Sequence, residues 1–193
     1  GMVKPEDMPR FIGHIRTEAQ RLVALIADII RLSQLDEGVE MPKENVELLS
    51  LAGEVAEDLR PAADKRSLTI SVDGQTAVVF GVRRLLYEML YNLCDNAIKY
   101  NRPDGSVRIH VESRAQDAVV SVLDTGIGIA PEHQSRIFER FYRVDKSHSK
   151  ASGGTGLGLS IVKHAALYHG GKLELESQPG RGTEIRVTLP KQN

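Results

Sequence analysis

The sequence lacks several features that would place it in a special class of protein. It has a single cysteine, Cys94, in 193 residues, which excludes an intramolecular disulfide and a zinc site built from several cysteines. No apolar run approaches the roughly 20 residues that a membrane-spanning helix requires, and there is no secretory signal. The net charge is only −1, so nothing global indicates nucleic acid or an anionic membrane as a partner. Because a single cysteine offers no disulfide within the chain, we expect a reducing, cytoplasmic setting.

The composition is that of a soluble globular protein. Hydrophobic residues make up 41% and charged residues 26% of the chain, and its length suits one sizeable domain with a smaller additional element. The opening Gly1-Met2 resembles a cloning remnant, so we expect the chain to be a fragment of a longer protein.

The first part of the chain predicts one long amphipathic helix, over about 9–36. Its apolar residues recur at spacings of three and four with charges between them, so they share one face. These residues are Phe11, Ile15, Leu22, Leu25, Ile26, Ile29, Leu32 and Leu35. Gly38 follows as a stop signal. A helix this long, with one apolar face, is expected to pack against partner helices.

Beyond a polar connector at 37–44, short strands alternate with helices. Strands are expected near 46–48, 68–72, 77–80, 107–112, 118–124, 172–177 and 183–189, and helices over about 49–65, 82–100 and 157–169. Strands paired as hairpins with helices inserted predict an α/β (α+β) two-layer sandwich, with a mixed, mostly antiparallel sheet packed on three helices. We expect residues 1–40 and 41–193 to form two separate units.

The stretch at 92–100 places four chemically useful side chains on one helix face. Asn92 and Asn96 lie four residues apart, and Lys99 and Tyr100 continue the same row. Amide oxygens suit a hard cation such as Mg²⁺, an ammonium suits phosphate, and an aromatic ring can stack on a base. Taken alone, the stretch also fits a solvated helix face with chance amides.

Two glycine-containing stretches follow. Asp124 ends an apolar strand, where its carboxylate can accept a hydrogen bond from an adenine amino group, and Gly126 and Gly128 after it allow close backbone approach. An ordinary turn is the alternative, because Asp and Gly favour turns. The stretch Gly-Gly-Thr-Gly-Leu-Gly at 153–158 opens a helix, whose N-terminal amide groups can bind phosphate. Its spacing is neither that of a dinucleotide fingerprint nor that of a P-loop.

The segment between these two stretches is basic. Arg136, Arg140, Arg143, Lys146 and Lys150 lie within it and could cover a triphosphate as a lid. A solvated charged surface explains most of these side chains equally simply. The two phenylalanines at 138 and 141 need something to bury against.

In this order the stretches resemble the catalytic ATP-binding domain of two-component sensor histidine kinases, which has the Bergerat fold. That family belongs to a wider group of ATPases with gyrase, the ninety-kilodalton heat-shock chaperones and the mismatch-repair ATPases. Residues 92–100 resemble the N box, 124–128 the first glycine box, 138–141 the F box and 154–158 the second glycine box. The F box and the Lys-Tyr ending of the N box favour sensor kinases, and Asn92 stands where gyrase-like ATPases place a catalytic Glu.

The resemblance implies ATP and Mg²⁺ as cofactors, with a set of residues at the phosphate end. Asn96 is the implied Mg²⁺ ligand. Asn92, Lys99 and Arg143 are the implied catalytic residues, Asn92 contacting phosphate or water and the two cations contacting the phosphates.

At the adenine end the resemblance implies that Tyr100 stacks near the base and that Asp124 accepts from its amino group. Thr183, on the last strand, would support Asp124. The remaining implied binding residues form the lid hinges, the phosphate cradle and the apolar walls of the adenine pocket. They are Gly126, Gly128, Ile129, Gly154, Thr155, Gly156, Leu157, Gly158 and Leu159.

The N-terminal helix resembles the second helix of the family's dimerisation and phosphoacceptor hairpin. The first helix, which carries the phosphorylated His followed by an acid, is missing. His14 is a poor match to that His, since Ile15 follows it in place of an acid. We expect His14 to lie on the helix surface.

The resulting expectation is the kinase core of a bacterial sensor histidine kinase. The intact protein would transfer the γ-phosphoryl of ATP to a His outside this chain and then to an Asp of a response regulator. It would form a homodimer through the hairpin, bind no nucleic acid, and reach the inner membrane only through upstream segments. The alternatives are an ATP-independent docking module of the same fold and a serine kinase of the anti-sigma type.

Overall fold

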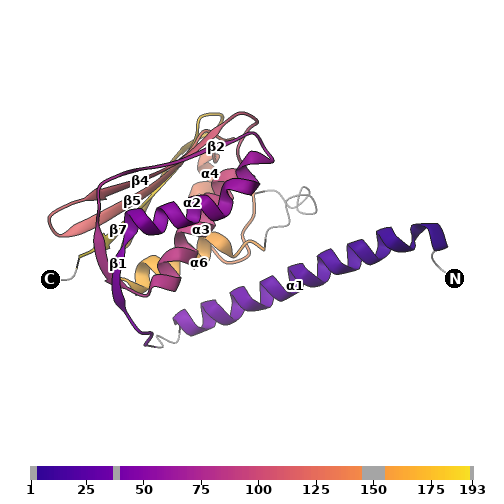
Figure 1. Cartoon of the computed structure of the whole chain (residues 1–193), viewed down its shortest axis with the longest axis horizontal. Helices are drawn as coiled ribbons and strands as arrows, with labels where there is room; N and C mark the ends of the chain where they lie inside the picture. The colour runs from indigo at the N-terminus through magenta and orange to yellow at the C-terminus, as the bar shows by residue number, and fades with distance from the viewer. Residues whose placement is uncertain (1–3, 37–39, 145–154, 192–193) are drawn as a thin grey trace.

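The computed structural model describes residues 4–36, 40–144 and 155–191. A short 3-10 turn, η1 (Pro5–Asp7), leads into the 29-residue helix α1 (Met8–Asp36). The chain from residue 40 onward forms an α/β unit, and the N-terminal part of α1 extends beyond that unit (Figure 1). In the described ranges no helix combines the length and the apolar composition that crossing a membrane requires.

The α/β unit is built on a mixed sheet of five strands in the order β2-β4-β5-β7-β6. Among the described strands, only the β2–β4 pair of this sheet is parallel, and its other pairs are antiparallel. A separate antiparallel ladder joins β1 and β3. The strands are β1 (Glu44–Glu47), β2 (Thr69–Gly74), β3 (Val78–Gly81), β4 (Ser106–Ser113), β5 (Asp117–Asp124), β6 (Lys172–Gln178) and β7 (Gly182–Pro190).

Three helices cover one face of this sheet (Figure 1): α2 (Leu48–Asp64), α3 (Arg83–Lys99) and α6 (Gly158–Tyr168). Helix α2 begins where the Glu47 carboxylate accepts from the N–H groups of Leu49 and Ser50, at 2.9 and 2.7 Å. Helix α6 ends at Tyr168, and Gly170, two residues further on, has a φ of +69° that suits the left-handed turn after a helix. A short helix, α4 (Pro131–Gln134), lies after β5.

The core lies between the helices and the sheet. Leu86, Met89 and Leu90 of α3 are fully buried in the same hydrophobic cluster as alternating residues of β4 such as Ile109. Each such side chain contributes roughly 1.5–3 kcal/mol when it is buried. Cys94 is also fully buried, and burial raises the pKa of its thiol.

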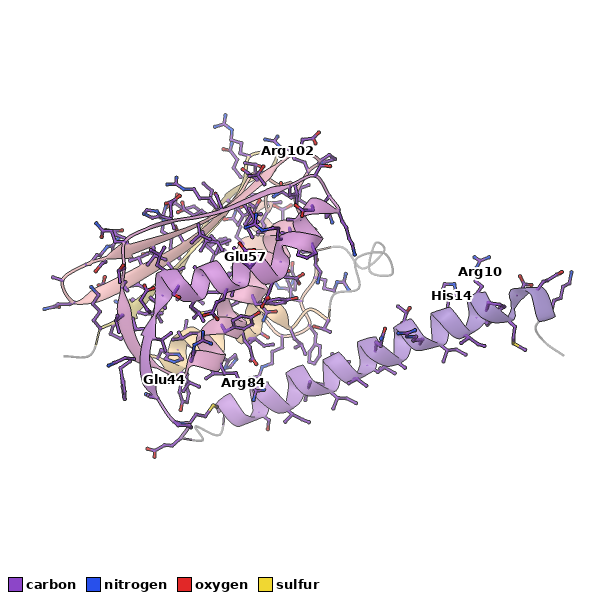
Figure 2. All side chains as sticks on the ribbon, in the orientation of Figure 1. Arg10, His14, Glu44, Glu57, Arg84 and Arg102 are labelled. Atoms are coloured by element: carbon purple, nitrogen blue, oxygen red, sulfur yellow. The ribbon has the colours of Figure 1, made fainter. Side chains whose placement is uncertain are left out.

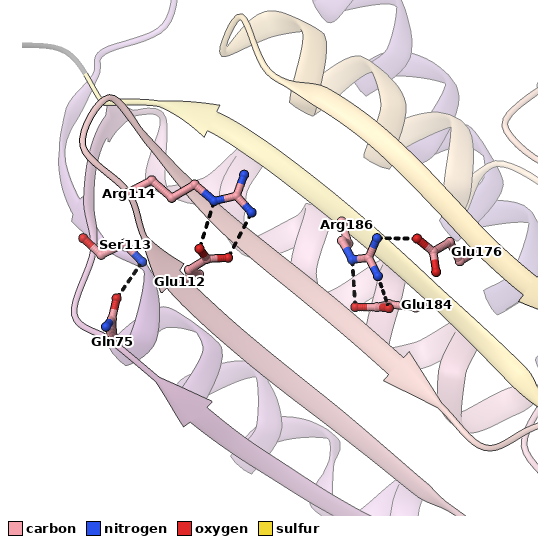
Figure 3. A network of polar contacts seen from close by, with 7 residues as sticks. All are labelled: Gln75, Glu112, Ser113, Arg114, Glu176, Glu184 and Arg186. Atoms are coloured by element: carbon pink, nitrogen blue, oxygen red, sulfur yellow. Dashed lines mark hydrogen bonds and ion pairs between the residues drawn. The ribbon is translucent and has the colours of Figure 1, made fainter.

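The other face of the sheet carries charged side chains paired across and along the strands (Figure 3). Arg186 of β7 contacts Glu176 of β6 at 2.5 Å and Glu184 of its own strand at 2.6 Å. Arg114 likewise pairs with Glu112. These side chains are exposed or half-buried, so this face is a solvated surface, where such pairs contribute little to stability.

The predicted fold class is confirmed, but one detail of strand pairing is wrong. The strands near 68–72 and 77–80 do not form a hairpin: β2 pairs in parallel with β4, and β3 pairs with β1. Helix α3 lies between β3 and β4 in the chain and supplies the crossover that a parallel pair requires. Helix α4 lies in the basic segment between the two glycine-containing stretches.

Candidate functional site

The polar face of α3 carries two amides whose nitrogens are held by the helix itself. The Nδ2 group of Asn92 donates to the carbonyl oxygen of Glu88 at 2.8 Å. The Nδ2 group of Asn96 donates in the same way to the carbonyl oxygen of Asn92 at 2.9 Å. Each amide oxygen is consequently the atom of its side chain that is suited to accept a hydrogen bond or to coordinate a cation.

The beginning of α6 lies directly against these amides. A Cβ atom at Gly158 would stand 2.7 Å from the Oδ1 atom of Asn92 and 3.5 Å from the Nδ2 atom of Asn96. Only a residue without a side chain therefore allows this approach. The N-cap residue, Leu157, is aliphatic and cannot satisfy the first N–H groups of the helix. Amide oxygens and helix N–H groups thus lie side by side.

The end of α3 carries Lys99 and Tyr100, each with a contact in the structure. The Nζ atom of Lys99 forms an ion pair with Asp95 at 2.6 Å, so the structure joins this ammonium to its own helix. Tyr100 is 44% exposed, and its carbonyl oxygen accepts from the N–H group of Ile127 at 3.1 Å. The backbone of Tyr100 therefore connects α3 to the loop after β5.

Asp124 lies half-buried at the end of β5. Burial raises the pKa of its carboxyl, while the N–H groups of Gly126 and Thr183 act in the opposite direction. The Gly126 N–H group donates to Oδ1 of Asp124 at 2.7 Å. A Cβ atom at Gly126 would stand 2.4 Å from the carbonyl oxygen of Tyr100, so glycine is required there.

The loop after Asp124 is fixed to the opposite hairpin. Gly128 has a φ of +68°, and a Cβ atom there would lie 2.0 Å from the carbonyl oxygen of Gln178. The N–H group of Ile129, which is half-buried, donates to Oγ of Ser177 at 2.8 Å. Ser177 in turn lies 2.8 Å from Oγ1 of Thr183. Thr183, paired with Asp124 in the sheet, thus joins β7 to this loop.

Two residues beside the candidate site were not predicted from the sequence. Ser177 holds the loop after β5, but a serine in an ordinary strand gives no signal of that contact. Asn101 is 5% exposed and donates from Nδ2 to the carbonyl oxygens of Ala97 and Ser106, both at 3.1 Å. Its place beside the turn at 102–105 was a signal that could have identified it as a helix-ending residue.

The F-box segment contacts the second glycine box through its backbone. The N–H group of Phe141 donates to the carbonyl oxygen of Gly156 at 2.9 Å, and Gly156 has a φ of +76°. Phe138 packs against the core, whereas Phe141 remains 58% exposed. The expectation of burial therefore holds for Phe138 and is wrong for Phe141, whose backbone has a left-handed φ of +63°.

Arg143 is half-buried and lies in the same segment. It lines a depression of about 380 Å³ with Arg136, Glu139, Arg140, Phe141 and Tyr142. A larger depression, of about 680 Å³, lies along the outer side of α3, and Asn92 is the one expected site residue among those that line it. Lys146 and Lys150 fall outside the described residues.

The second glycine box begins outside the described residues, because Gly154 belongs to the part that the structure leaves undescribed. Oγ1 of Thr155 accepts from the N–H group of Leu157 at 3.3 Å. Leu157 is fully buried, and Leu159 packs against the main core. Within the described ranges, 4–36, 40–144 and 155–191, no group of three or more His, Cys, Asp or Glu side chains could hold a metal ion.

His14 lies on the part of α1 that extends beyond the α/β unit (Figure 2). It is exposed, as are the apolar residues Phe11, Ile12 and Ile15 around it. Nearer its other end α1 contacts α6, where Leu25 packs against Leu157 and Ile161.

Comparison with known proteins identifies the family of this arrangement. Residues 81–193 match the family described as histidine kinase-, DNA gyrase B-, and HSP90-like ATPase. The chain is 39% identical over 189 residues to the sensor-like histidine kinase SenX3 of Mycolicibacterium smegmatis, covering 97% of this chain and 49% of that protein. The chain thus spans about half the length of the curated relatives it matches.

Two solved structures have closely similar folds. Full-length ShkA in complex with AMPPNP superimposes with a TM-score of 0.84 at 25% identity, covering 96% of this chain and 39% of the other. Histidine kinase ThkA in complex with the response regulator protein TrrA superimposes with a TM-score of 0.77 at 25% identity, covering 98% of this chain and 53% of the other.

Proposed function

The chain belongs to the family of histidine kinase-, DNA gyrase B- and HSP90-like ATPases, and we propose that it is the ATP-binding kinase core of a two-component sensor histidine kinase. The observation that carries this proposal is the approach of Gly158 to the amides of Asn92 and Asn96. It brings the N–H groups of a helix N-terminus, which bind phosphate, beside amide oxygens, which suit Mg²⁺.

The residues at this point fit a magnesium nucleotide. A Cβ atom at Gly158 would fill the space beside Oδ1 of Asn92, so the site is kept open at the cost of a glycine in a helix. We assign Asn96 as a Mg²⁺ ligand and Asn92 as a contact to phosphate or water. When bound, Mg²⁺ offsets the negative charge of the phosphates. Lys99 reaches phosphate in this proposal only by exchanging its ion pair with Asp95.

We place the adenine at the other end of the α3 face. Asp124 accepts from the adenine amino group there, because its half-buried carboxylate is held by Gly126 and Thr183. Tyr100 and Ile129 border the base, and Leu159 adds an apolar wall. We assign Gly128 and Gly156 to the hinges of a lid over the nucleotide, and Arg143 as a contact to the phosphates.

The intact protein would act as a sensor histidine kinase, as its relatives are named. We propose that it supplies ATP to a phosphoacceptor His on a helix outside this chain, and that the phosphoryl group passes on to a receiver-domain Asp. The complex of ThkA with TrrA supports a response regulator as the partner. Residues 1–40 would form the second hairpin helix and 41–193 the catalytic domain.

The exposed apolar residues of α1 support a homodimer formed through the hairpin. Phe11, Ile15, Leu22, Ile26 and Ile29 are all exposed although they lie on one face. Pairing with helices of the hairpin would cover this face. A membrane location of the intact protein would depend on segments beyond this chain.

Titration calorimetry with Mg·ATP tests the proposal. We expect one nucleotide per chain, and loss of binding in Asp124→Ala, because the adenine amino group loses its acceptor. Asp117→Ala, at the opposite end of the same strand, is the matched control and should bind normally. Retained binding by Asp124→Ala would reject the assigned site, and failure of the unchanged chain to bind ATP would favour the docking module.

A further inference from the structure

The last turn of α6 holds the connector that follows α1. The hydroxyl oxygen of Tyr168 accepts from the backbone N–H group of Met41 at 3.0 Å. The ammonium of Lys43 lies 5.3 Å from the centroid of the same ring, within the range of a cation–π contact. The described part of the connector, residues 40–43, is therefore attached to α6 immediately before β1 begins.

His169, the next residue, attaches the same turn to the beginning of α3. Its Nε2 atom accepts from the N–H group of Val82 at 2.9 Å, and its Nδ1 atom lies 2.7 Å from the carbonyl oxygen of Ala165. A Cβ atom at Gly81 would stand 2.6 Å from the imidazole. These contacts define a neutral ring that donates from Nδ1 and accepts at Nε2.

Helix α6 is therefore fixed to α3 at both of its ends. At its N-terminus Gly158 lies against Asn92, and at its C-terminus His169 binds the residue that precedes α3. The connector is thus held by the helix whose other end borders the proposed phosphate site. Helix α1 also contacts α6 directly, through Leu25, so the connector is a second attachment of the N-terminal segment to the helix that borders the phosphate site.

We propose that Tyr168 is a positioning residue for phosphoryl transfer: its hydroxyl fixes the connector, and through it the hairpin, relative to the nucleotide site. This inference rests on the proposed function. The contact made by Tyr168 matters because group transfer is sensitive to geometry: a misplacement of about 1 Å can lower a rate by roughly a hundredfold.

Tyr168→Phe tests this role without disturbing the packing. Phenylalanine keeps the ring beneath Lys43 and removes the hydroxyl that accepts from the Met41 N–H group. We expect amide hydrogen exchange at Met41 to become about three- to tenfold faster, as the loss of one hydrogen bond predicts. The affinity of this chain for ATP should change by less than about twofold, because Tyr168 lies at the far end of α6 from Gly158.

In the full-length protein, Tyr168→Phe should lower kcat for autophosphorylation and leave the KM for ATP unchanged. Tyr87→Phe is the matched control: it also removes one tyrosine hydrogen bond, to Asp58 at 2.5 Å between α2 and α3. We expect it to leave both the exchange at Met41 and kcat at their original values.

Three results would overturn the inference: unchanged exchange at Met41, an unchanged kcat, or a kcat loss matched by an equal rise in KM, which a merely structural role would produce. Failure of the unchanged chain to bind ATP is a separate outcome that would reject the proposed function. The exchange measurement does not depend on nucleotide, so the two failures can be distinguished.

Discussion

Replacing Gly158 by alanine should weaken nucleotide binding while leaving the stability of the fold nearly unchanged. The added Cβ atom would lie 2.7 Å from Oδ1 of Asn92, so the Asn92 side chain must rotate away. That rotation breaks its 2.8 Å hydrogen bond to the Glu88 carbonyl oxygen, at a cost of about 1 kcal/mol. Alanine is more favourable than glycine in a helix by up to about 1 kcal/mol. The two effects nearly cancel.

The expected stability change is therefore small, within about 4 °C in Tm. Binding should suffer more, because the methyl group covers the beginning of α6 and displaces an amide oxygen. Hydrogen bonds to charged groups contribute about 1.5–3 kcal/mol each, so the affinity for Mg·ATP should fall roughly 10- to 150-fold.

Differential scanning calorimetry and titration calorimetry measure the two quantities on the same protein. Gly53→Ala is the matched control, because Gly53 lies within α2 and a Cβ atom there meets nothing within 4 Å. It should be stabilised by up to about 1 kcal/mol and bind ATP normally. Wild-type affinity in Gly158→Ala would refute the placement of phosphate between α6 and α3.

Two further predictions concern buried groups. Burial lowers the pKa of His169. The stability that the neutral ring contributes is therefore present above the unfolded pKa, near 6.5, and is lost as the pH falls through the lower pKa of the folded state. Thermal unfolding measured between pH 7.5 and pH 5 should show this loss of stability, and the loss should be smaller in His169→Gln. Because burial raises the pKa of the Cys94 thiol, a thiol reagent at pH 8 should modify the unfolded chain only, and rapid modification of the native chain would contradict its place in the core.

Local features of the sequence were sufficient to predict the elements that carry most residues of the proposed site. Helix α3 contains no glycine or proline, so its length and the row from Asn92 to Tyr100 followed from helical spacing alone. Asp124 could be placed because an apolar strand precedes it and glycines follow it. In both cases the signal lies within a few residues of the feature.

Features made by distant contacts could not be predicted in the same way. The Met41–Tyr168 hydrogen bond joins residues 127 apart in the sequence, and the Val82–His169 bond joins residues 87 apart. Nothing near Tyr168 indicates that its hydroxyl accepts from the connector. The pairing of β2 with β4 likewise depends on how α3 packs, which strand propensity does not encode.

The side-chain amide resonances of Asn92 and Asn96, followed by nitrogen-15 NMR during titration with Mg·ATP, test the central claim most directly. We predict that these resonances and the backbone amides of Gly126 and Gly158 shift most, and that the shifts saturate at one nucleotide per chain. Shifts concentrated instead along the outer side of α3, at Tyr87 and Tyr91, with Asn96 and Gly126 unchanged, would contradict the proposed site.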